Sequence, residues 1–121
     1  MKALKNDNAN EEYYLTDIIK YASNQGLSID TVSPSLDFEA KGVNSKQQLA
    51  ELERDYQLES ASRLMKAGVT IRDPMRIDIR GTLTCDSDVS IDVGCIFEGN
   101  VRLGKNVSIE SNVIIRDSIV K

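Results

Sequence analysis

The sequence of 121 residues contains no histidine and no tryptophan, and it has only two cysteines. The absence of histidine excludes Ser-His-Asp and Cys-His catalysis, and zinc sites built on imidazole. Cys85 and Cys95 form neither a Cys-x-x-Cys motif nor a secreted disulfide framework. The first twenty residues lack the apolar core of a signal peptide, and no apolar run approaches membrane-spanning length. We therefore expect a cytoplasmic protein.

The composition is that of a soluble globular chain, with 40% hydrophobic and 28% charged residues. The 15 basic and 19 acidic side chains give a formal net charge of -4. Because phosphate binding needs a basic face, this balance disfavours nucleic acid and anionic membranes as partners.

Residues 1–46 mix helix and strand patterns. Apolar residues between Tyr14 and Ala22 recur at helical spacing, and Gly26 supplies a stop. Residues 27–32 then predict a short strand, followed by a loop over 33–43. One helix and one strand cannot bury a core of their own, so the pattern predicts the end of a larger α/β domain.

Residues 47–68 predict one long helix, since they contain no proline and Gly68 supplies the stop. Ser45 and Gln48 match a capping box at its start. At about 1.5 Å per residue the helix is about 33 Å long. The predicted apolar stripe consists of Leu49, Leu52, Tyr56, Ala61, Leu64 and Met65. So long a helix with so narrow a stripe indicates a linker between domains.

Residues 79–120 repeat with a period of six, and the first and fifth places of every six are apolar. The first places are Ile79, Cys85, Ile91, Phe97, Leu103, Ile109 and Ile115, and the fifth are Leu83, Val89, Cys95, Val101, Val107, Val113 and Ile119. At a 40% apolar frequency, the chance of this pattern is about three in a million per frame. All these positions are odd-numbered, so both columns face one side of an extended chain.

The third and fourth places of the sixes favour corners. They are rich in glycine, asparagine, aspartate and serine, which tolerate left-handed backbone angles or bond their own turn. The fourth places are Thr82, Asp88, Gly94, Asn100, Asn106, Asn112 and Ser118. The chain is therefore predicted to form a β-solenoid with six residues per side and both apolar columns inward.

Several other side chains in this region have simple structural interpretations. Cys85 and Cys95 fall in the inward columns, so we expect buried structural thiols. Arg72, Arg76 and Arg80 lie near Asp73 and Asp78, which predicts surface ion pairs. Five acidic residues fall on outward or corner places, which favours a solvated face over metal or acid–base work: Asp88, Asp92, Glu98, Glu110 and Asp117.

The sixes IDVGCI, LGKNVS and IESNVI resemble the hexapeptide repeat of left-handed β-helix acyltransferases. Four longer stretches, NANEEYYLTDII, GVNS, RDPMRIDIRGTLT and DVSIDVGCIFEGNVRLG, resemble in order and spacing the bifunctional bacterial N-acetylglucosamine-1-phosphate uridyltransferase / glucosamine-1-phosphate N-acetyltransferase family. The resemblance implies an α/β tail (1–46), a linker helix (47–68) and the first coils of a left-handed parallel β-helix (69–121), incomplete at both ends.

The family resemblance also implies a function. The parent enzyme acetylates glucosamine-1-phosphate from acetyl-CoA and then joins the product, N-acetylglucosamine-1-phosphate, to UTP with Mg²⁺, giving UDP-N-acetylglucosamine. It assembles as a homotrimer through its β-helix. The family's glycine-rich nucleotide loop and its acetyltransferase histidine are not found in this sequence. We therefore expect no complete catalytic site in this chain and no turnover by it alone.

Three residues match family positions near the sugar nucleotide. The resemblance implies that Asn44 is both a substrate-binding residue and an amide ligand of the magnesium ion, which prefers oxygen donors. It also implies that the hydroxyls of Tyr14 and Thr16 bond the sugar. Purely structural roles remain open: Asn44 as the cap of the long helix, Thr16 or Asp17 as the cap of the first helix, and Tyr14 packed inside.

Two other functions remain open. A solenoid of about 2.3 coils leaves an open sheet end, so the chain could be a non-catalytic trimerisation or assembly module. A stand-alone hexapeptide acyltransferase ranks last, because such enzymes usually need a catalytic histidine and a full stack of coils.

Overall fold

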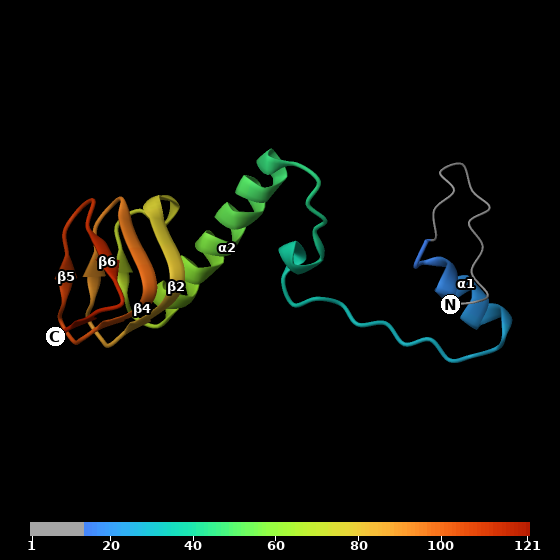
Figure 1. The fold of residues 1–121 in the computed structure, drawn as a ribbon. Coiled ribbons are helices and arrows are strands. Elements are labelled where there is room, and N and C mark those ends of the chain that lie inside the picture. Colours follow the sequence, from blue (N-terminus) through green and yellow to red (C-terminus); the bar gives the residue numbers. More distant parts are fainter. Residues whose placement is uncertain (1–13) are drawn as a thin grey trace. The chain divides into compact units, whose positions relative to one another are not determined.

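The structure, a computed structural model, describes residues 14–121 and divides the chain into two compact units between Ser35 and Leu36 (Figure 1). The described part of the first unit holds one helix, α1 (Asp17–Asn24). Gly26 follows it with φ 67°, which confirms the predicted stop. No residue of α1 is buried. The first unit, as far as it is described, therefore has no core of its own.

The strand predicted over residues 27–32 is wrong. Residues 27–34 form neither helix nor strand. A short strand is stable only when it pairs with a neighbour. Among the described residues before Leu36 there is no other strand to supply that pairing.

The long helix α2 (Lys46–Lys66) confirms the predicted linker helix. A short 3₁₀ turn, η1 (Asp37–Ala40), precedes it. Ser45 is the N-cap, and its Oγ accepts a hydrogen bond from the Gln48 N–H at 3.1 Å. The Gln48 side chain reaches back to the Asn44 N–H at 2.8 Å, one residue before the position a capping box predicts.

The predicted apolar stripe of α2 is correct only in part. Ala61 is fully buried and Leu64 packs against the core, but Leu49, Tyr56 and Met65 are exposed. Gln57 is the other buried residue of the helix. The later turns of α2 contact the strands. The strands therefore do not bury the apolar side chains of its first turns.

After α2 the chain winds through short parallel strands (Figure 1). One sheet is formed by β1 (Thr70–Ile71), β3 (Ser90–Ile91) and β5 (Ser108–Ile109). The other is formed by β2 (Ile77–Cys85), β4 (Cys95–Leu103) and β6 (Ile114–Arg116), and β7 (Ile119–Val120) also pairs with β4. A 3₁₀ turn, η2 (Pro74–Arg76), lies between β1 and β2.

The pairing register follows the predicted period. Ile79 pairs with Phe97, and Phe97 pairs with Ile115, so each coil lies three sixes beyond the last. Thirteen of the fourteen predicted inward residues are buried or pack against the core. Val69, Ile71 and Ile77 extend this core before the predicted repeat.

The corners explain how nine-residue strands bend. Four fourth-place residues have left-handed angles, as predicted: Asp88, Gly94, Asn106 and Asn112. The remaining corner uses third-place residues instead: Gly81, Gly99 and Asp117. This corner lies within β2 and β4, and a Cβ on Gly81 would collide with the backbone oxygen of Gly99.

The register slips at both ends of the stack. Ile71 pairs with Ile91, an offset of twenty residues, because η2 lengthens the first coil by two residues. Arg102 pairs with Ile119, an offset of seventeen, so the last coil is one residue short. The inward position predicted for Ile119 is therefore wrong: it is 68% exposed, and Val120 packs against the core.

Candidate functional site

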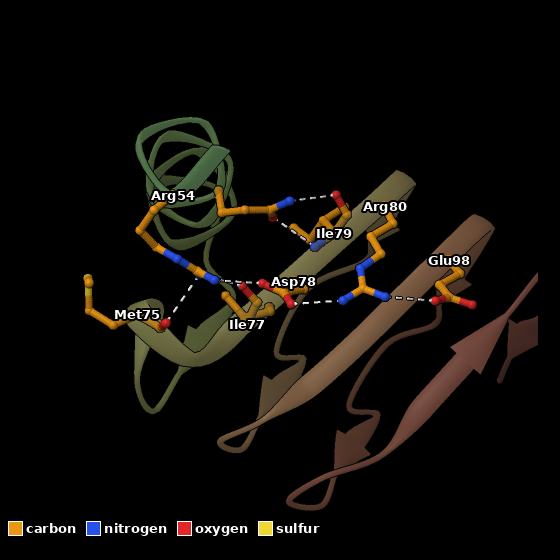
Figure 2. A network of polar contacts seen from close by, with 8 residues as sticks. Arg54, Met75, Ile77, Asp78, Ile79, Arg80 and Glu98 are labelled. Atoms are coloured by element: carbon orange, nitrogen blue, oxygen red, sulfur yellow. Dashed lines mark hydrogen bonds and ion pairs between the residues drawn. The ribbon is translucent and has the colours of Figure 1, made fainter. Parts of the chain in front are cut away.

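The joint between α2 and the coils is a polar network (Figure 2). Gln57 is 2% exposed and bonds both backbone groups of Ile79. Its Nε2 donates to the Ile79 carbonyl at 3.0 Å, and the Ile79 N–H donates to its Oε1 at 2.8 Å. Arg54 donates to the carbonyl oxygens of Met75 and Ile77 at 3.2 and 3.3 Å. Side chains of α2 thus bond the first residues of β2 on its outer edge, where no strand of the described residues 14–121 pairs.

A ladder of alternating charges continues from this joint across the coils. Arg54 donates to Asp78 at 2.9 Å, and Arg80 bonds Asp78 at 3.2 Å and Glu98 at 3.1 Å (Figure 2). Arg116 bonds Glu98 from the next coil. The hydrogen bond from Arg116 is the main cause that lowers the pKa of Glu98, with Arg80 adding to it. The ladder connects the helix to three successive coils.

Two of the three arginines form ion pairs, but only Arg80 pairs with a predicted partner, Asp78. Arg80 is part of the ladder, and Arg72 pairs with Asp92 at 3.1 Å. Arg76 makes no ion pair with any of residues 14–121. Asp73 instead caps η2, because its carboxylate accepts from the Met75 N–H at 2.9 Å.

An open groove of about 510 Å³ lies between η1, α2 and β2. Its lining is mostly apolar and includes Phe38, Leu49, Leu52, Tyr56 and Ile79. The rings of Phe38 and Tyr56 meet edge to face with centroids 6.4 Å apart. Glu39, Glu53 and Arg80 also line the groove, but its open shape and mostly apolar walls give it the character of a packing surface rather than of a catalytic cleft.

Asn44 lies two residues before α2 and is exposed. The alternative role as a helix cap is wrong, because Ser45 caps α2. The Asn44 backbone N–H donates to Gln48, whereas its side-chain amide bonds no residue within 14–121. Its amide oxygen is therefore available to a ligand.

The donor set near Asn44 fits only a partial magnesium site. Mg²⁺ takes about six oxygen ligands in octahedral geometry, and Asn44 supplies one. In the described part of the chain no cluster of three or more His, Cys, Asp or Glu residues could hold a metal ion. Asn44 can serve as a single ligand of a site completed by groups outside these residues, so its metal role stays a prediction.

Tyr14 and Thr16 belong to the first unit, and Asn44 belongs to the second. Thr16 occupies the N-cap position of α1 but makes no side-chain capping bond. Tyr14 is 39% exposed rather than packed inside. The structural alternatives for Thr16 and Tyr14 therefore find no support, and their sugar-binding roles stay predictions.

The prediction of buried structural thiols is confirmed for Cys95, whereas Cys85 is only partly buried against the core. Cys95 is 1% exposed, and its Sγ donates to the Glu110 carbonyl at 3.2 Å. Burial raises the pKa of both thiols, and for Cys85 burial together with the nearby Asp86 carboxylate raises the pKa to about 11. Such thiols are poor nucleophiles at neutral pH.

No helix within residues 14–121 is both long and apolar enough to cross a membrane.

Known proteins resemble the chain along its whole length, although no family model matches it. It is 56% identical over 118 residues to the bifunctional protein GlmU of Paraburkholderia phytofirmans. The aligned segment covers 98% of this chain and 26% of that protein. For GlmU of Ralstonia nicotianae the identity is 54% over 121 residues, covering 100% and 27%. Over its own whole length, the chain is homologous to GlmU. This confirms the family resemblance, and the chain spans about a quarter of the length of these relatives.

The sequence analysis of this GlmU-like chain did not identify two residues that hold the joint. Arg54 and Gln57 hold the joint, yet both are polar and lie outside the apolar stripe. The signal that could have found them is their spacing with Ala61 and Leu64, at i, i+3, i+7 and i+10, which is one face of a helix. A search for apolar residues alone passes over such a face.

Proposed function

We propose that this chain is the part of a GlmU-type transferase that connects its two catalytic domains. Residues 1–46 would be the end of the nucleotidyltransferase α/β domain, residues 47–68 the linker helix, and residues 69–121 the first coils of the acetyltransferase domain. The observation that carries the proposal is the match of 52–56% identity over nearly the whole chain to proteins named bifunctional GlmU.

We also propose that the coils belong to a left-handed β-helix. Parallel pairing at offsets of eighteen residues, with three left-handed corner residues in each eighteen, supports a three-sided coil. The left hand comes from the resemblance to hexapeptide-repeat acyltransferases, which are an exception to the usual right-handed crossover. A trimer built through this β-helix is part of the same proposal.

The activity would be that of the whole enzyme. It acetylates glucosamine-1-phosphate from acetyl-CoA and then transfers a uridylyl group from UTP, releasing pyrophosphate and giving UDP-N-acetylglucosamine. A bound magnesium ion would neutralise charge on the phosphates. In this chain Asn44 would offer its amide oxygen to that ion beside the sugar nucleotide, and Tyr14 and Thr16 would hold the sugar through their hydroxyls.

A chimera tests this function. Residues 14–121 of this chain would replace the matching segment of GlmU from Paraburkholderia phytofirmans. We expect both activities within about tenfold of the parent, because about half of the residues are identical. A folded chimera that lost both activities would contradict the proposed function.

Asn44→Ala in the same chimera tests the metal role. Removing one oxygen ligand is expected to lower uridylyl transfer by about tenfold or more and to raise the magnesium concentration that it requires. Acetyl transfer should stay unchanged. Asn24→Ala, an exposed asparagine at the end of α1, is the matched control. Equal loss in both variants would remove Asn44 from the proposed site.

The chain alone should be inactive. We expect no pyrophosphate from UTP and N-acetylglucosamine-1-phosphate with Mg²⁺, and no free CoA from acetyl-CoA and glucosamine-1-phosphate. Magnesium-dependent formation of UDP-N-acetylglucosamine by the pure chain would contradict this expectation. The alternative of a non-catalytic assembly module is not favoured by the comparisons.

A further inference from the structure

The segment before α2 folds back onto that helix and is attached to it at two points. The rings of Phe38 and Tyr56 meet edge to face. The Lys41 Nζ lies 2.8 Å from a carboxylate oxygen of Asp55. A 3₁₀ turn repeats every three residues, so Phe38 in η1 and Lys41 just after it lie on one side of the turn. Their partners are consecutive residues of α2, so the four residues form a single attachment, which we call the latch.

The latch joins α2 at a turn that is itself fixed to the coils. Arg54 and Gln57 of this turn bond backbone groups of β2. The Lys41–Asp55 pair is weak by itself, because the two side chains are 54% and 42% exposed. The aromatic contact adds to it. The segment is thus attached to a rigid part of the molecule by two weak contacts that act together.

Asn44 lies between the latch and the cap of α2. Gly42 and Val43 alone separate it from Lys41. Gly42 has no atom within 4 Å of an added Cβ, so packing does not restrain this permissive residue. On the other side, the Asn44 N–H donates to the Gln48 Oε1 at 2.8 Å. Because the Asn44 side chain bonds no residue within 14–121, the position of its amide oxygen depends on how firmly its backbone is held from both sides.

We propose that the latch positions Asn44 for its metal, with Lys41 and Asp55 as positioning residues. This inference rests on the proposed function, because the metal role of Asn44 belongs to it. The latch acts through the backbone on the N-terminal side of Asn44, as the cap acts on the other side. A ligand whose backbone is already ordered loses less conformational entropy when the ion binds, so the latch lowers the magnesium concentration that the site requires.

Charge reversal in the full chain tests the latch without any enzymatic activity. The backbone N–H order parameters of Val43 and Asn44, measured by NMR relaxation, should be about 0.85 in the unaltered chain. Lys41→Glu and Asp55→Lys should each lower them below about 0.6, because each sets like charges against one another. The double variant restores an ion pair of reversed polarity and should restore the order. Lys66→Glu, the same change at an exposed residue of α2, is the control.

Order parameters that stay high in both single variants would overturn the proposal. A double variant that remains as mobile as the single variants would also overturn it, because the ion pair would then not be the cause of the order. Phe38→Ala releases the aromatic half of the latch without any change of charge. It should lower the same order parameters, and unchanged values would contradict a joint action of the two contacts.

The magnesium requirement of the chimera tests the consequence for the site. Lys41→Glu and Asp55→Lys should each raise the concentration for half-maximal uridylyl transfer by about threefold or more. The double variant should return to within about twofold of the unaltered chimera, and acetyl transfer should not change. A direct effect of charge on the ion would shift the two single variants in opposite directions. Opposite shifts, or no shift, would therefore overturn the proposal.

Asn44→Ala in the same chimera separates failure of this inference from failure of the proposed function. If Asn44→Ala leaves uridylyl transfer unchanged, the metal role of Asn44 is wrong and the inference falls with it. If Asn44→Ala lowers the transfer but release of the latch leaves the magnesium requirement unchanged, only the inference is overturned. Loss in Asn44→Ala together with a raised requirement in both single variants would support both.

Discussion

At the scale of single residues, the corners make the strictest demands on the sequence. Gly81 and Gly99 stand at equivalent corners of successive coils, with φ of 146° and 69°. At Gly81 the obstacle to any side chain is the backbone of Gly99, which cannot turn away as a side chain could. Its angle also lies in a region that is open almost only to glycine.

Gly81→Ala should therefore be among the most damaging small substitutions. We expect a loss of about 3 kcal/mol in the free energy of unfolding, from backbone strain and from separation of two coils. Gly42→Ala is the control, because no atom lies within 4 Å of its added Cβ and its φ is not left-handed. Urea unfolding followed by circular dichroism measures both. Equal stability of the two variants would show that the backbone at this corner accommodates a side chain without cost, which would contradict the prediction.

The Cys85 thiol provides a prediction that depends on pH. Burial and the Asp86 carboxylate raise its pKa from 9.0 to about 11. At pH 8 its thiolate fraction should be about a hundredfold lower than that of an ordinary thiol, and alkylation by iodoacetamide should slow accordingly. The rate should climb until pH passes 11. Mass spectrometry of the Cys85 peptide measures it, and the urea-unfolded chain, expected to react normally, is the control.

At the scale of elements, α2 shows what local sequence can and cannot predict. Its bounds were predicted to within two residues, because a serine cap and a glycine stop act within one turn. The face that α2 buries could not be predicted from the helix sequence alone. Gln57 and Arg54 face inward because they bond backbone groups of β2, which lies more than twenty residues further along the chain. The strand over 27–32 failed for the same reason: pairing depends on a distant partner.

Arg54 is expected to contribute more to stability than an arginine in an ordinary surface pair. It bonds two carbonyls and Asp78, whereas Arg63 has one partner within residues 14–121, Glu59 four residues earlier. Arg54→Met keeps the apolar stem and should cost about 1–2 kcal/mol in the free energy of unfolding. Arg63→Met should cost about 0.5 kcal/mol or less. Urea unfolding compares them, and an equal cost would mean that the joint is no stronger than a surface pair.

At the scale of the whole molecule, the six-residue period predicted the core because parity is a rigid rule for extended chains. It missed the slips at η2 and β7, because adding or removing one or two residues at a corner changes register without disturbing apolar spacing. The candidate site, unlike the core, could not be predicted from a sequence pattern. Asn44, Tyr14 and Thr16 came from resemblance, and the geometry of residues 14–121 tests only their structural alternatives. When the residues of a binding site come from several segments, the sequence of one segment shows no periodic pattern that would reveal the site.

The two units should differ in resistance to trypsin, because cleavage requires a stretch of backbone to unfold locally. Lys20 lies in α1, a helix with no buried residue, whereas Arg102 lies in β4, bonded through its N–H to Ser118 at 3.0 Å. Cleavage after Lys20 should be faster than after Arg102 by on the order of tenfold or more. Mass spectrometry of a timed digest distinguishes the products, and in urea the two rates should converge. Equal rates without urea would mean that the coils open as readily as α1, which would contradict a stability centred on the interior of the coils.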